Sequence, residues 1–217
     1  FVFSDTWIGD VDPESRVRRK MMLINNSMAV LDGSAADRSR IAFMWRKADN
    51  AAAFVPADAT RWYWLQDGFI RGDYLYDFPM IIEKNRDGPK GFQFRTTGVA
   101  LLTIPLANGV PDFTKTKSRK MKLYTTKGKT RIFYGAGVMA GSADGFIYVY
   151  GRMHLGFSVD LVVARVRADK VEEQHAWRFW NGDEWSADID ESASLGPGGP
   201  ELSVTRMNAG PLRGKYI

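Results

Sequence analysis

The chain has 217 residues, 45% hydrophobic and 13% aromatic, which supplies enough apolar side chain for the core of one large domain or two small ones. The net charge is +5, and basic residues cluster only in residues 16–20 and 115–129, which we expect to be solvated loops rather than a nucleic-acid surface. The absence of cysteine excludes disulfides, thiolate metal ligands and cysteine nucleophiles, and no apolar run approaches the roughly 18 residues of a membrane-spanning helix.

The first part of the chain predicts three strands, in residues 1–9, 21–31 and 41–45. The second of these is interrupted by Asn25 and Asn26. A buried strand tolerates asparagine only where its amide is hydrogen-bonded, so both residues are either structural bonding groups or contacts to a substrate. Because no convincing amphipathic helix occurs anywhere in the chain, we expect an all-β fold.

The next stretch, residues 61–83, predicts two strands joined by a tight turn at 71–73. Its second half alternates apolar and polar residues with a period of two, and Asp67 lies at the mouth of this hairpin. A further strand is expected over 92–105, where β-branched residues lead to a terminal proline. Residues 108–122 are polar and turn-rich, and we expect a loop there.

A similar sequence pattern occurs at residues 133–151, where a Gly-rich strand, a polar turn and a Tyr-rich strand follow one another. The small residues at 135–138 suit an innermost strand, where side chains have little room. Strands are also expected at 160–166 and 177–180, and the Asn-Gly pair at 181–182 is a hairpin signal.

A third and weaker occurrence of this strand–turn–strand pattern follows at the end of the chain. The occurrences are roughly sixty to seventy residues apart, a longer spacing than in the repeats of common propeller blades. Inserted loops would account for this. We expect one domain of repeat units at about 1–60, 61–131 and 132–195, with a further unit beginning at 201–217. The chain begins without Met and ends inside strand-like sequence, so we expect it to be processed or incomplete, with residues missing after its C-terminus.

Together these segments resemble the five-bladed β-propellers of the glycoside-hydrolase type, specifically a bacterial group long labelled a domain of unknown function, some of whose relatives are endo-acting D-arabinanases. The motifs that carry the resemblance are Ser4-Asp5-Thr6-Trp7, Asn25-Asn26, Trp64-Leu65-Gln66-Asp67-Gly68, Gly135-Ala136-Gly137, Ile147-Tyr148-Val149-Tyr150-Gly151, Ala164-Arg165-Val166, Trp177-Arg178-Phe179-Trp180-Asn181-Gly182 with Trp185, Ser203-Val204 and Gly214-Lys215-Tyr216. The resemblance implies an all-β, five-bladed β-propeller of which this chain holds about three to four blades.

The resemblance also implies that carboxylates from different blades meet in one central pocket. Asp5, Asp67 and Glu201 each lie at the edge of an expected inner strand in a different unit. Glycoside hydrolysis needs one protonated carboxyl group and one ionised one. By analogy, Asp5 is the base or nucleophile, Glu201 the general acid and Asp67 an orienting or pKa-tuning partner, although the acid of related families usually comes from the third unit.

Several further residues are expected to contact substrate, because aromatic planes stack on sugars and amides bond to hydroxyl groups. These residues are Trp7, Asn25, Asn26, Trp64, Gln66 and His154. Each also has a structural interpretation, as blade packing for the tryptophans and as a hydrogen-bonded loop residue for His154. Trp177, Trp180 and Trp185 fall on expected outer strands and are taken as structural.

No cofactor is expected, and the two histidines, His154 and His175, lack metal-ligand spacing. Calcium binding at the centre of a propeller is left open, because Asp and Asn side chains offer oxygen ligands. We expect a glycosidase that is extracellular or at the cell surface, has a polysaccharide partner and binds no nucleic acid. The alternative is a propeller of the same fold that does not catalyse a reaction and is instead a carbohydrate-binding or structural protein of the cell surface. Open sheet edges would permit self-association.

Overall fold

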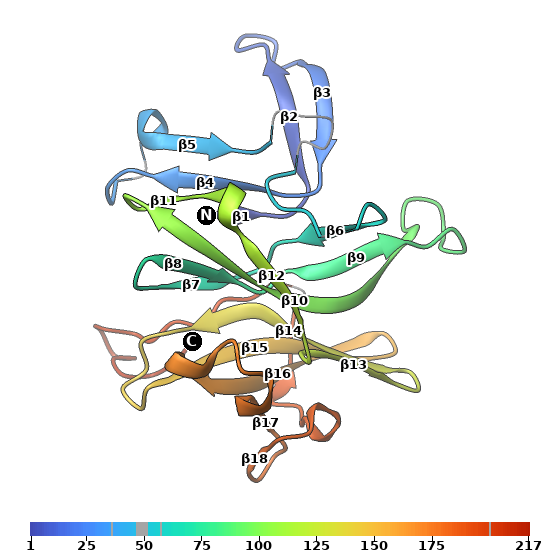
Figure 1. Ribbon diagram of the computed structural model, residues 1–217, viewed down its shortest axis with the longest axis vertical. Helices are drawn as coiled ribbons and strands as arrows, with labels where there is room; N and C mark the ends of the chain where they lie inside the picture. The colour runs from blue at the N-terminus through green and yellow to red at the C-terminus, as the bar shows by residue number, and fades with distance from the viewer. Residues whose placement is uncertain (36, 47–51, 57, 200) are drawn as a thin grey trace.

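The computed structural model describes residues 1–35, 37–46, 52–56, 58–199 and 201–217, and these form an all-β fold. Three of its sheets lie one above another in Figure 1, a propeller-like arrangement. The helices of this described part are single 3-10 turns, none of which could cross a bilayer. They are η1 (Arg38–Arg40), η2 (Phe113–Lys115), η3 (Ala168–Lys170), η4 (Gln174–Ala176) and η5 (Ile189–Glu191).

The first sheet has three antiparallel strands in the order β1-β4-β5, and a separate two-stranded hairpin, β2–β3, projects beside it (Figure 1). The strands are β1 (Val2–Phe3), β2 (Thr6–Val11), β3 (Arg18–Ile24), β4 (Ser27–Leu31) and β5 (Ile41–Met44).

The second and third sheets are larger and also antiparallel. The second contains β6 (Arg61–Trp64), β7 (Gly68–Arg71), β8 (Tyr74–Asp77), β9 (Met80–Lys84), β10 (Phe94–Ala107), β11 (Val110–Pro111) and β12 (Lys117–Met121). The third contains β13 (Tyr124–Lys127), β14 (Thr130–Met139), β15 (Phe146–Leu155), β16 (Ser158–Arg167), β17 (Arg178–Trp180), β18 (Trp185–Ser186) and β19 (Gly196–Pro197).

The long strand β10 shows how the sheets stack, because it is buried on both faces. Its side chains alternate between two cores: Val99 and Leu101 pack with the third sheet, whereas Ala100, Leu102 and Ile104 pack with residues of the first sheet and the start of the second. All five are at most 1% exposed. A strand covered on both sides reads as a continuous apolar run, which explains the sequence of residues 99–104.

The strand pairing is broken in each of the two larger sheets and between the first sheet and the hairpin beside it. In the second sheet, residues 65–67 separate β6 from β7 opposite residues 78–79. In the third, the register between β14 and β15 shifts at residues 135–136. Between β1 and β2 the break falls at residues 4–5. At such a break, backbone groups are left without a strand partner and side chains change direction. Breaks of this kind are common next to functional sites.

The predicted all-β class is confirmed, and the hairpin of residues 61–83 forms with its turn at Gly72, which adopts φ +56. The prediction of loops at 16–20 and 115–129 is wrong in part, because β3, β12 and β13 occupy much of these segments. The polar segment 108–122 likewise contains β11 and β12. Lysine and arginine suit exposed edge strands, where charge discourages pairing with another chain, so basic sequence did not indicate a loop.

Candidate active site

A cavity of about 770 Å³ lies where the strand breaks of the three sheets meet. Its walls come from residues 2–5, from residues 64–67, from Ala136 in the bulge of β14 and from residues 201–203 after β19. The three carboxylates singled out in the sequence, Asp5, Asp67 and Glu201, all line it. The structure thus brings together acids that are up to 196 positions apart in the chain (201 − 5).

Asp67 is the most firmly held of the three. One carboxylate oxygen accepts a hydrogen bond from the Gly68 N–H at 2.8 Å, and the other accepts one from the Val138 N–H at 2.7 Å. Its own N–H donates to the Gly135 carbonyl at 3.2 Å. Because these bonds join the breaks of the second and third sheets, the side chain is fixed in the cavity wall.

Asp5 is oriented by an aromatic neighbour. The indole N–H of Trp64 donates to one Asp5 oxygen at 2.7 Å, and the Trp64 ring packs edge-on against Phe94 with centroids 4.7 Å apart. The preceding Ser4 hydroxyl donates to the Leu65 carbonyl at 2.7 Å, which ties the first sheet to the second. Trp64 therefore lines the cavity, and its indole N–H orients Asp5.

Arg152 of β15 is a cavity residue that the sequence interpretation missed. Its side chain is 8% exposed, stacks over the Phe133 ring at 4.6 Å and donates to the Gln66 side-chain oxygen at 2.9 Å. Gln66 in turn donates to the Phe78 carbonyl at 2.9 Å. Burial lowers the pKa of Arg152 to about 10, with a smaller contribution from a neighbouring arginine, while the Glu201 charge acts in the opposite direction.

Asp77 was also missed, and it lies in the strand next to Asp67. It is 1% exposed, and neither of its carboxyl oxygens has a hydrogen-bond partner among the described residues. Burial, followed by the negative charge of Asp67, raises its pKa well above the usual range, although the Gln66 backbone opposes the shift. Its strand partner is Gly68, where a Cβ would meet the Tyr76 carbonyl, so only glycine permits this close approach.

The model of the family described as Domain of unknown function (DUF5005) matches residues 1–209. The chain belongs to the DUF5005 family. Among solved structures, this DUF5005 chain is similar to one described as a candidate hydrolase from Bacteroides ovatus, with 16% identity and a TM-score of 0.61. The match covers 87% of the chain but 50% of that protein, so the chain spans half the length of this structural relative. At this identity the likeness shows the fold alone. None of the curated proteins matches the chain.

Four of the predicted substrate contacts lie outside the cavity lining of the described DUF5005 chain. Asn26 is fully buried, and its side chain bonds the Phe54 N–H, the Phe54 carbonyl and the Tyr63 carbonyl, so it is a structural link between segments. Asn25 is half-buried beside it.

The other two predicted contacts outside the lining are Trp7 and His154. Trp7 is 56% exposed on β2. His154 stacks on Phe133 with ring centroids 5.2 Å apart, and burial, then nearby arginines, lowers its pKa.

No group of three or more His, Asp and Glu side chains within the described ranges is arranged to hold a metal ion. Calcium at a propeller centre, which the sequence leaves open, stays unassigned.

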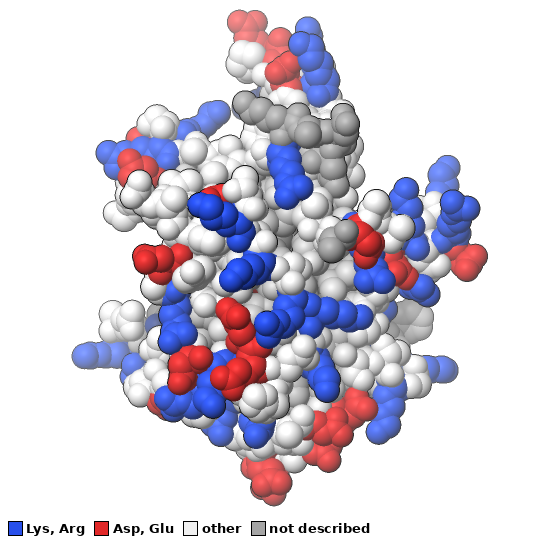
Figure 2. All heavy atoms as spheres, in the orientation of Figure 1, with Lys and Arg blue, Asp and Glu red and all other residues white. Residues whose placement is uncertain are grey.

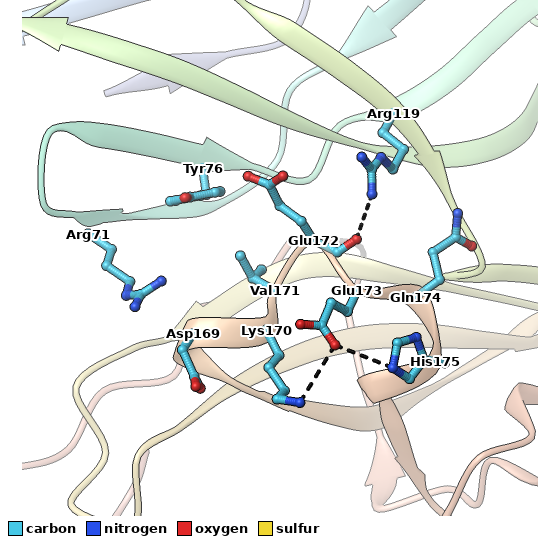
Figure 3. Close-up of a pocket in the computed structure, with 10 residues that line it drawn as sticks. All are labelled: Arg71, Tyr76, Arg119, Asp169, Lys170, Val171, Glu172, Glu173, Gln174 and His175. Atoms are coloured by element: carbon cyan, nitrogen blue, oxygen red, sulfur yellow. Dashed lines mark hydrogen bonds and ion pairs between the residues drawn. The ribbon is translucent and has the colours of Figure 1, made fainter.

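A second depression of about 580 Å³ lies between the β7–β8 hairpin, β12 and the η3–η4 segment (Figure 3). Part of its charge is paired within the depression: Glu173 contacts Lys170 at 3.7 Å and His175 at 3.3 Å, and Arg119 donates to the Glu172 carbonyl at 2.8 Å. On the face shown in Figure 2, acidic and basic side chains are interspersed over the same region. We therefore take the 770 Å³ cavity as the candidate active site.

Proposed function

We propose that this chain forms part of a five-bladed β-propeller glycoside hydrolase that cleaves a polysaccharide outside the cell or at its surface. The observation that carries the proposal is the convergence of Asp5, Asp67 and Glu201, from three separate segments, on one cavity. The fold-level likeness to a candidate hydrolase supports it by analogy only.

The chemistry assigns a role to each carboxyl group. Hydrolysis requires an acid that protonates the leaving oxygen, and a carboxylate that either activates a water molecule or attacks the anomeric carbon. Among the described residues, no hydrogen bond holds the Glu201 carboxyl, so it is the group free to deliver a proton. Asp5, aimed by the Trp64 indole, is the base or nucleophile.

Asp67 is the orienting partner in this assignment. Both of its oxygens are already engaged by backbone N–H groups, which leaves it little freedom to attack or to transfer a proton. It contributes a fixed negative charge next to a developing oxocarbenium ion, where preorganised charge is most effective.

The test is a hydrolysis screen against bacterial and plant polysaccharides, arabinans and arabinogalactans included. Asp5→Asn and Glu201→Gln should each lower the rate by about 10²-fold or more, as expected when an acid or base is removed. Asp87→Asn, an exposed loop substitution outside the cavity, is the matched control and should keep full activity. Unchanged activity in both cavity variants, or no product from any polysaccharide with the wild type, would contradict the proposal.

A second candidate function is carbohydrate binding without cleavage. It is favoured by the fact that Asp5 and Asp67 are both engaged in hydrogen bonds within the chain itself. Binding of a glycan without release of any product, in the same screen, would select this function over hydrolysis.

A further inference from the structure

The candidate cavity has charges of opposite sign on different walls. Asp5 and Asp67 come from the breaks of the first and second sheets, whereas Arg152 comes from β15 of the third. Arg152 is more than nine-tenths buried and still lines the cavity. A buried guanidinium in a binding cavity calls for an explanation, because removing a charge from water is costly unless the charge is paired.

No salt bridge among the described residues neutralises that charge, although the Glu201 carboxylate acts on it over a longer distance. Among the described residues, no carboxylate lies within 4.0 Å of the Arg152 guanidinium nitrogens. One terminal nitrogen contacts the neutral Gln66 oxygen at 2.9 Å and the Met80 sulfur at 3.7 Å, and Phe133 supports the guanidinium plane. The Nε atom is buried and has no partner in the described chain. The group is thus held in place but not paired.

The surroundings of Arg152 on the third sheet are also basic. Arg131 lies directly opposite His154 in the β14–β15 register, two pairs along from Phe133 and Arg152. The positive charges of Arg131 and Arg152 both lower the pKa of His154, after burial, and Arg131 also lowers that of Arg152. The Glu201 charge acts in the opposite direction on Arg152. Two guanidinium groups with one neighbouring carboxylate favour an anionic ligand group at this wall, although Asp5 and Asp67 lie on the other walls.

We propose that Arg152 binds the carboxylate of a uronic acid, so that the substrate of this cavity is an acidic polysaccharide. The inference rests on the proposed carbohydrate function and names its substrate class. A planar guanidinium matches a carboxylate in a two-bonded geometry that neutral hydroxyl groups cannot reproduce. A sugar held in this way would place its carboxylate on the third-sheet wall and a glycosidic bond towards Asp5 and Asp67.

The test measures binding rather than cleavage, by affinity gel electrophoresis against polygalacturonate, alginate and glucuronoxylan. Each is compared with the same preparation after chemical reduction of its carboxyl groups to alcohols. Wild-type protein should be retarded by at least one acidic polysaccharide and released when that polysaccharide is reduced. Arg152→Met should weaken this binding about 10- to 100-fold, the range expected for loss of a hydrogen bond between charged groups.

The matched control is Arg165→Met. Arg165 is also a third-sheet arginine stacked on aromatic rings, at 4.4 Å from Phe146 and 4.2 Å from Trp185, and its Nε also has no partner among the described residues. Because it does not line the cavity, its loss should leave glycan binding unchanged. Arg152→Lys keeps the charge and loses the planar fork, so it should bind with intermediate strength, and it decides the question if Arg152→Met does not fold.

Three results would overturn the inference: equal binding of native and reduced polysaccharides, equal binding by wild type and a folded Arg152 variant, or no retention by any acidic polysaccharide. Failure of the inference is distinct from failure of the proposed function. A neutral polysaccharide cleaved equally well by wild type and Arg152→Met would keep the hydrolase and remove the acidic substrate. Carboxylate-dependent binding without release of any product would keep the acidic polysaccharide as ligand and remove the hydrolase.

Discussion

The buried carboxyl group of Asp77 makes a prediction about stability that is independent of any substrate. In the folded protein Asp77 is 1% exposed, has no hydrogen-bond partner in the described chain and has a pKa raised well above its usual range. In the unfolded chain the same group has a pKa of about 3.9. The folded state therefore holds a proton that the unfolded state releases, and stability falls as the pH rises between these two values.

The magnitude follows from linkage. Each pH unit above about 3.9, and below the folded pKa, costs the wild type about 1.4 kcal/mol of unfolding free energy. For a chain of 217 residues this is about 3 to 6 °C in Tm per pH unit. Asp77→Asn keeps the shape but cannot titrate. Its Tm, relative to the wild type, should therefore rise with pH by about these increments over the range in which Asp77 stays protonated in the fold.

The Tm of both proteins is measured by scanning calorimetry at pH 4.5, 5.5 and 6.5. A constant cost of burying the amide cancels in the slope, so the pH dependence is the observable. The negative charge of Asp67 contributes to the shift, so when both proteins carry Asp67→Asn the difference in Tm should stop growing at a lower pH. Parallel Tm curves for wild type and Asp77→Asn would show that Asp77 is ionised in the fold and would refute the reasoning.

Three further predictions concern other residues. Asn26→Ala removes three hydrogen bonds to buried backbone groups and should cost about 3 kcal/mol or more, measured as a lower urea midpoint. Gly68→Ala would place a Cβ 2.1 Å from a backbone oxygen, so its thermal destabilisation should exceed the roughly 1 kcal/mol of Gly72→Ala, where the space is open and only the left-handed conformation is strained. Trp64→Phe removes the donor to Asp5 and, if the cavity is hydrolytic, should lower kcat about 10-fold with a smaller change in KM.

Much of the fold could be predicted because period-two patterns and turn residues are local signals. The hairpin with its turn at Gly72, and the long strands β15 and β16, were evident from alternation and from tyrosine- and valine-rich composition. The strand β12 was not, because its residues are exposed except Met121, and its partner β10 is what makes it a strand. Context decides β structure at an edge more than propensity does.

The candidate site divides in a similar way. Asp5, Asp67 and Glu201 were singled out because each follows or precedes an expected inner strand, and all three line the cavity. Arg152 and Asp77 gave no such signal. One occupies an ordinary position within β15, and the other lies between two aromatic residues in a regular alternation. What makes each unusual is burial without a charged partner, which only the folded chain reveals.

The strand breaks connect these observations. In a regular ladder every backbone N–H is used in strand pairing, and the side chains point at the cores above and below the sheet. No backbone donor or side chain is then left to face the cavity. At residues 65–67 and 135–136 the ladder is interrupted, and the Val138 N–H beside the second break binds Asp67 in place of a strand partner. Gly135, with φ +117 and no room for a Cβ beside Gln66, allows the third sheet to approach the second at this level. The same irregularity thus aims a carboxylate into the cavity, supplies the donor that fixes it and brings Gln66 within reach of Arg152.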